Sequence, residues 1–226
     1  WDFWISVYEN NIIGAELNEV IYLYRRRNNS VTSKNFDTID KAFSLKDDDV
    51  IINCGAFIGF GDLHLSKELK NGKIYALEAD RTCFSYLKKN LMYNKIMNVS
   101  PINRAVWNTQ TELTLHTGYA QGNSLVEDIH DWDNAYSVKT ITIDELVEEK
   151  GLSRVSMLSL TLNGAEIEAL EGATETISRF KPRIRLAGWY KRDGELICNL
   201  TKKQLEKHGY KVIKHVHQLF VKKDKK

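Results

Sequence analysis

The chain has 226 residues, of which 42% are hydrophobic and 27% charged, so its length and composition suit one globular domain rather than two. No run of about 18 consecutive apolar residues occurs, and the sequence therefore predicts no membrane span. The formal net charge is +2, and the basic runs at 25–27 and 222–226 are too short to form the basic stripe typical of nucleic-acid binders, so no nucleic-acid partner is expected.

The opening part of the chain, residues 1–47, is predicted to form a short N-terminal cap on one domain that spans residues 48–226. From residue 49 onward, apolar runs alternate with helical patterns. Strands are predicted at 50–54, 73–77, 99–103, 112–116, 138–141, 155–162 and 184–186, with a final antiparallel pair at 211–216 and 218–221. Helices are predicted at 61–69, 81–93, 143–149, 165–180 and 202–207.

Strands that alternate with helices imply right-handed crossovers and a parallel sheet covered on both faces. We therefore expect an α/β fold with a doubly wound, mostly parallel, Rossmann-like sheet of seven strands and an antiparallel terminal strand. Ligands of such sheets bind outside the carboxyl ends of the strands, where the strand order reverses. This rule points to the strand ends near residues 53, 78, 103 and 161.

The three cysteines, Cys54, Cys83 and Cys198, are widely spaced and odd in number. This pattern argues against a disulfide framework and favours a reducing compartment. We therefore expect a cytoplasmic protein.

A glycine-rich turn, residues 53–61, follows the first predicted strand, and the next strand ends at Glu78. Glycines let a backbone bend sharply and approach a ligand closely. A carboxylate about 20 residues beyond such a turn is placed to accept hydrogen bonds from both ribose hydroxyls of a nucleoside. The alternative role for Glu78 is to cap the helix that begins at Arg81, a role that Asp80 fits better.

Six segments resemble the FkbM type of S-adenosylmethionine-dependent methyltransferase, in the family's order. Residues 49–59 (Asp-Val-Ile-Ile-Asn-Cys-Gly-Ala-Phe-Ile-Gly) are similar to the family's Asp-Val-Val-Ile-Asp-Val-Gly-Ala-Asn-Ile-Gly. The other segments are Lys73–Asp80, Asn103–Trp107, Ser124–Val126, Thr140–Leu146 and Gly164–Ala173. Together they cover roughly residues 48–190.

The resemblance implies a class I methyltransferase fold that binds S-adenosylmethionine, with Glu78 on the ribose. The cofactor contacts that it implies are Asn53, Gly55, Ala56, Phe57, Gly59, Glu78, Ala79, Asp80, Asn103, Arg104 and Ala105. Ser124, Thr161 and Asn163 are the implied contacts to the methyl acceptor. No metal ligand is expected, and no catalytic residue is assigned.

Several positions depart from the family pattern, and most of them replace a carboxylate. Asn53 stands where the family has Asp, and Phe57 stands where it has Asn. Thr161 and Asn163 replace an Asp and a Glu, and a further Glu corresponds to Ala187 or Gly188. Amides and hydroxyls bind the cofactor's sulfonium and ammonium about half as strongly as carboxylates do, and they cannot act as a general base.

Two interpretations from different classes follow. The first is an O-methyltransferase that acts on a hydroxyl of a small molecule or glycan, as is typical of the family. The alternative is a catalytically lapsed binding or scaffolding module, which the missing carboxylates favour. An RNA or protein methyltransferase is a third reading, with slender support from the basic segments. Acceptor pockets are built from loops without a transferable motif, so the sequence identifies neither the acceptor nor the oligomeric state.

Overall fold

The computed structural model describes residues 45–118, 122–126, 134–188, 190–215 and 218–223. The predicted cap lies almost wholly outside these residues, so that domain boundary stays a prediction. Within the described parts of the chain, no helix has both the length and the apolar character needed to cross a membrane.

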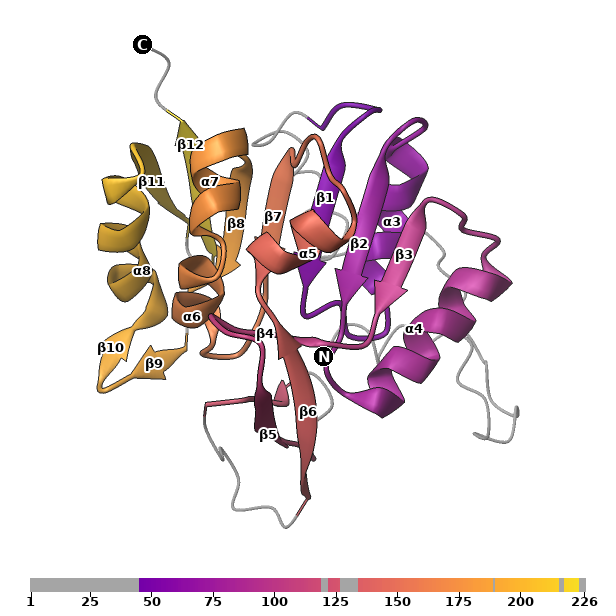
Figure 1. Cartoon of the computed structure of the whole chain (residues 1–226), viewed down its shortest axis with the longest axis horizontal. Coiled ribbons are helices and arrows are strands. Elements are labelled where there is room, and N and C mark those ends of the chain that lie inside the picture. The colour runs from indigo at the N-terminus through magenta and orange to yellow at the C-terminus, as the bar shows by residue number, and fades with distance from the viewer. Residues whose placement is uncertain (1–44, 119–121, 127–133, 189, 216–217, 224–226) are drawn as a thin grey trace.

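Within the described residues, seven strands form the central sheet in the order β11-β12-β8-β7-β1-β2-β3 (Figure 1). Their bounds are β1 Val50–Cys54, β2 Lys73–Leu77, β3 Val99–Ile102, β7 Met157–Leu160, β8 Arg183–Ala187, β11 Tyr210–His215 and β12 Gln218–Lys223. The strands from β8 to β3 are parallel to one another, whereas β12 is antiparallel to both of its neighbours. The predicted α/β class and mostly parallel sheet are thereby confirmed.

The strand order reverses beside β1. The chain continues from β1 to β2 and β3 on one side, and it returns to β7 and β8 on the other. The carboxyl ends of β1, β2 and β7 therefore meet at the kind of switch point where α/β sheets bind ligands.

Helices cover both faces of the sheet because neighbouring strand residues point to opposite sides. Ile51 packs with Leu63 of α3 (Phe60–Glu68) and Leu87 of α4 (Arg81–Tyr93) on one face. Ile52 belongs to the core on the other face, which includes Leu146. That second face is covered by α5 (Ile143–Glu149), α6 (Glu166–Glu171), α7 (Thr174–Phe180) and α8 (Ile197–Lys207).

Two small β structures flank the carboxyl edge of the sheet (Figure 1). One contains β4 (Ala105–Val106), β5 (Glu112–His116) and β6 (Ala135–Ile141), in which β6 pairs in parallel with β4 and antiparallel with β5. The other is the hairpin of β9 (Lys191–Arg192) and β10 (Glu195–Leu196). Strands β4, β9 and β10 have two residues each, too few to show a periodic pattern, and the sequence did not predict them.

The single helix predicted over 165–180 is wrong, because the chain forms α6 and α7 with a break at Gly172. A Cβ at Gly172 would lie 2.4 Å from a backbone oxygen in the loop after β4, so the chain passes closely there. The Asp144 carboxylate accepts hydrogen bonds from the backbone N–H groups of Glu175 and Thr176, at 3.0 and 2.7 Å. This cap comes from α5 and satisfies donors that a second helix start leaves free.

Helix α8 begins at Ile197, five residues before the predicted start at position 202. Its first turn is anchored by the preceding segment, since the N–H of Ile197 donates to Tyr190 O at 2.8 Å and that of Cys198 donates to Gly188 O at 3.2 Å. Both partners belong to a loop whose course depends on β8. The local sequence therefore carries no signal for this start.

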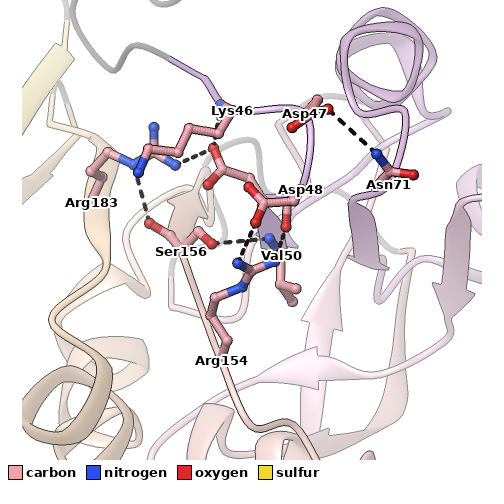
Figure 2. A network of polar contacts seen from close by, with 9 residues as sticks. Lys46, Asp47, Asp48, Val50, Asn71, Arg154, Ser156 and Arg183 are labelled. Carbon is pink, nitrogen blue, oxygen red and sulfur yellow. Dashed lines mark hydrogen bonds and ion pairs between the residues drawn. The ribbon is translucent and has the colours of Figure 1, made fainter.

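At the amino edge of the sheet, the neighbouring residues Asp48 and Asp49 each pair with an arginine. Figure 2 labels Asp48, Arg154 and Arg183 of these two pairs. Asp49 is buried and pairs with Arg183, whose Nε also donates to Ser156 O at 3.2 Å. Asp48 and Arg154 form the exposed pair, with 2.7 Å between Oδ2 and Nη1. These contacts hold the starts of β1, β7 and β8 together, at the edge opposite the carboxyl ends of the parallel strands.

Candidate functional site

The glycine turn after β1 lies between the end of β2 and the loop that follows β7. The backbone N–H groups of Gly55 and Ala56 both donate to Leu77 O at 2.9 Å. Gly55 has φ +82°, and a Cβ there would lie 2.0 Å from Thr161 O. Only glycine fits this crossing, so the turn brings bare backbone to the carboxyl edge of the sheet.

Glu78 joins this turn to the end of β2. Its Oε2 accepts a 2.7 Å hydrogen bond from the N–H of Phe57, and its Oε1 accepts one of 2.9 Å from the N–H of Asp80. Burial raises the pKa of Glu78 to about 7, although these backbone hydrogen bonds oppose the shift. A carboxylate has about four acceptor positions, and these two bonds leave capacity for the hydroxyls of a ligand.

Asp80 is the N-cap of α4, as the capping alternative proposed. Its Oδ1 accepts from the N–H of Cys83 at 2.7 Å, and its Oδ2 accepts from the Tyr136 hydroxyl at 2.9 Å. The capping alternative for Glu78 is therefore filled by Asp80, and contact between Glu78 and a ribose stays a prediction. Contact between Asp80 itself and the cofactor stays a prediction.

Tyr136 was missed by the sequence reasoning. It lies on β6, and the Arg81 guanidinium stacks 4.1 Å from the centroid of its ring. Its hydroxyl also accepts from the N–H of Arg81 at 3.0 Å. The pairing of β6 with β4 brings Tyr136 next to a helix start 55 residues earlier in the chain, and no local pattern could indicate that contact.

Asn103, beyond the end of β3, is tied to the same place. Its Nδ2 donates to Glu78 O at 2.7 Å and to Ala79 O at 3.1 Å. Arg104 follows it, and Ala105 is buried in β4. The residues predicted to contact the cofactor at the ends of β2 and β3 therefore lie together, while their contact with adenine stays a prediction.

Two of the three residues predicted to contact the methyl acceptor form hydrogen bonds that join two loops. The Ser124 hydroxyl donates to Asn163 O at 2.8 Å, and Asn163 Nδ2 donates to Asn123 O at 2.8 Å. Both side chains are buried, whereas Thr161 is half-buried beside the glycine turn. Among the three, Thr161 is the best placed to meet a substrate, and that role stays a prediction.

Two carboxylates at the carboxyl edge were also missed. Glu166 is fully buried, and its oxygens accept from the N–H groups of Leu162 at 2.8 Å and Gly164 at 3.0 Å. Burial raises the pKa of Glu166 to about 7. Glu168 pairs with Arg192 of β9 at 2.6 Å, which attaches the β9–β10 hairpin to α6. Glu166 lies inside a segment that matches the family pattern, so that match was the signal available for it.

Asn53 does not stand alone at the end of β1. Its Nδ2 donates a 2.9 Å hydrogen bond to Oδ1 of Asp62, which lies in the first turn of α3. Burial raises the pKa of this carboxyl to about 7, partly offset by the bond from Asn53. The acid that the family pattern has at position 53 is absent, yet a carboxylate lies directly behind that position.

Comparison with known proteins identifies a family for most of the chain. Residues 53–221, more than half of the chain, match the family model described as the Methyltransferase FkbM domain. The crystal structure of methyltransferase FkbM from Methylobacillus flagellatus is 18% identical with a TM-score of 0.58, and the match covers 79% of this chain and 44% of that one. A SAM-dependent methyltransferase from Aquifex aeolicus is 17% identical with a TM-score of 0.48, covering 82% of this chain and 86% of that one.

A curated relative matches over a shorter length. This is the tRNA(Phe) (4-demethylwyosine(37)-C(7)) aminocarboxypropyltransferase of Methanocaldococcus jannaschii, 36% identical over 61 residues. The match covers 27% of this chain and 24% of that protein, so the chain spans only about a quarter of the relative's length. The likeness to the Methylobacillus flagellatus structure shows the fold, and the family model covers both the glycine turn and Glu78. The chain belongs to the FkbM methyltransferase domain family.

Proposed function

We propose that this chain binds S-adenosylmethionine at the carboxyl ends of β1 and β2 and transfers its methyl group to a hydroxyl of a small molecule or glycan. The observation that carries the proposal is the position of Glu78. Its carboxylate is fixed by the N–H groups of Phe57 and Asp80, and it keeps acceptor positions for the two ribose hydroxyls. Membership of the FkbM family supports the same cofactor.

The glycine turn suits the methionine part of the cofactor. Gly55 lets the turn pass close to the backbone of Thr161 at the carboxyl edge of the sheet, and Asn53 offers a half-buried amide beside it. The cofactor carries a sulfonium and an ammonium, and both favour oxygen acceptors in a partly dry site.

Methyl transfer breaks the bond between sulfur and the methyl carbon and forms one between that carbon and the acceptor oxygen. The acceptor proton must leave to a base or to water. Thr161, beside the glycine turn, can orient the acceptor hydroxyl by hydrogen bonding, but it cannot take its proton. Positioning alone contributes a large part of such a bimolecular step.

Calorimetric titration with S-adenosylmethionine and S-adenosylhomocysteine tests the proposal. Glu78→Gln should weaken binding by at least about tenfold, because it loses a charge-assisted acceptor for the ribose. Glu148→Gln, at an exposed position on α5, is the matched control and should bind like the wild type. Wild-type protein that binds neither compound at millimolar concentration would remove the proposed cofactor.

Transfer is tested separately, with a methyl-labelled cofactor and a panel of polyols and glycans. Label that appears in an ether product identifies the acceptor class. A second candidate, a binding module that has lost catalysis, is favoured by Asn53, Thr161 and Asn163, which replace family carboxylates. If the protein binds the cofactor tightly but forms no S-adenosylhomocysteine with any acceptor of the panel, the binding module is the better interpretation.

A cytoplasmic location, as expected from the cysteine pattern, belongs to the same proposal. Cys54, Cys83 and Cys198 are all buried and unpaired with one another. Free thiols of this kind suit a reducing compartment. Fractionation of the native source followed by detection of the chain would test the location.

A further inference from the structure

Asp62 is a carboxylate that the fold buries at a cost. Its side chain is 0% exposed, in the first turn of α3 beneath the glycine turn. Oδ1 accepts from Asn53 Nδ2 at 2.9 Å, whereas Oδ2 is buried and has no hydrogen-bond partner in the described part of the chain. A buried acceptor without a partner is destabilising, so a carboxylate here calls for a reason beyond packing.

The bond to Asp62 fixes the orientation of the Asn53 amide. An ionised carboxylate can only accept hydrogen bonds, so the amide must turn its NH₂ group toward Asp62. The single amide oxygen of Asn53 then points to the opposite side. Because Asn53 is half-buried and Asp62 fully buried, the oxygen is the end that a ligand at the carboxyl edge can reach.

The pair also carries charge to the site. A carboxylate in a poorly polarisable interior acts over a longer distance than one in water, and hydrogen bonds in a chain strengthen one another. The resemblance to the family places an Asp at position 53, where this chain has the neutral Asn53. Asp62 stands one hydrogen bond behind that position.

We infer that Asp62 is a positioning residue for the cofactor: it holds the Asn53 amide with its oxygen toward the cofactor's ammonium and supplies, from behind, the negative charge that position 53 lacks. This inference rests on the proposed binding of S-adenosylmethionine. It assigns a role in cofactor affinity to a residue that does not contact the cofactor.

The inference separates affinity from stability. If Asp62 were only structural, its replacement by Asn would lower stability and affinity together. A positioning role predicts that affinity falls while stability is kept or rises. Asp62→Asn removes a buried charge that destabilises the empty protein, and it also frees the Asn53 amide to rotate. Burial, which raises the pKa of Asp62 to about 7, is the cost that the variant would relieve.

The test combines calorimetry with S-adenosylhomocysteine and thermal unfolding, both at pH 8. Asp62→Asn should bind about tenfold more weakly, as expected for losing a charge-assisted contact, with a Tm equal to or above that of the wild type. The double variant Asn53→Asp/Asp62→Asn keeps the hydrogen-bonded pair and exchanges its ends. It should recover affinity to within about threefold of the wild type. Asp48→Asn, at the opposite edge of the sheet, is the control. It should leave the affinity unchanged and should lower Tm only by the small contribution of the exposed Asp48–Arg154 pair.

Unchanged affinity of Asp62→Asn in a wild-type background that binds the cofactor would overturn the inference and leave the proposed function standing. A double variant that binds no better than the single one would also overturn it. A wild type that binds no cofactor at all would remove the proposed function and this inference together.

Discussion

The backbone N–H of Phe57 and the carboxylate of Glu78 are joined by a 2.7 Å hydrogen bond that links the glycine turn to the end of β2. Phe57 makes this bond from a left-handed conformation, with φ +53°. A bulky L-residue is rarely found there, so the contact fixes a strained backbone at the proposed ligand site.

Replacing Phe57 by Asn, the residue of the family pattern, should relieve this strain. Asn tolerates the left-handed region, and we expect the free energy of unfolding to rise by about 1 kcal/mol in urea titrations. Lys95→Asn is the matched control, since Lys95 is exposed and has φ +54°. Stabilisation by Lys95→Asn together with destabilisation by Phe57→Asn would mean that packing of the Phe57 ring outweighs the strain.

Gly55→Ala should be strongly destabilising, by more than about 2 kcal/mol, and should abolish cofactor binding. The new Cβ would meet Thr161 O at 2.0 Å in a backbone with φ +82°. Gly61→Ala serves as the comparison, because nothing outside its own helix backbone and chain neighbours lies within 4 Å of a Cβ there, and α3 gains helix propensity. Urea unfolding measures both variants. Equal stability of the two would show that the turn can open away from the loop after β7.

The two Asp–Arg pairs of Figure 2 should differ in their contribution to stability. Asp49→Ala leaves the partly buried Arg183 without its carboxylate and should lower the free energy of unfolding by about 3 kcal/mol. Asp48→Ala removes the exposed partner of Arg154 and should cost at most about 1 kcal/mol. Denaturant midpoints for the two variants decide this, and equal losses would contradict the difference in burial.

The stability of the empty protein should fall as pH rises from 5 to 8. Burial raises the pKa values of Asp62, Glu78 and Glu166 to about 7, from ordinary values near 4. The stabilisation by their neutral forms is complete below the unfolded pKa and is lost as pH rises through 7. Tm measured across this range should therefore decline, and Asp62→Asn should make the decline shallower. A Tm that rises with pH over the same range would contradict these pKa directions.

Much of the fold could be predicted from the sequence because its signals are local. Val50–Cys54 is a mostly apolar run followed by Gly55, and Arg81–Tyr93 follows the capping residue Asp80, so the local sequence predicts both elements. The break between α6 and α7 could not be read in this way, because the cap at its second start comes from Asp144 on another helix. Local sequence patterns do not predict contacts with residues that are distant along the chain.

The same division holds at the site. The sequence by itself determined the doubly wound sheet, the glycine turn and the place of Glu78, since periodicity and strand ends are properties of adjacent residues. Only the tertiary structure decided that Asp62 lies behind Asn53, and that Ser124 and Asn163 hold two loops together. Those contacts depend on how a helix and loops pack over the strand ends, where distance in space is unrelated to distance along the chain.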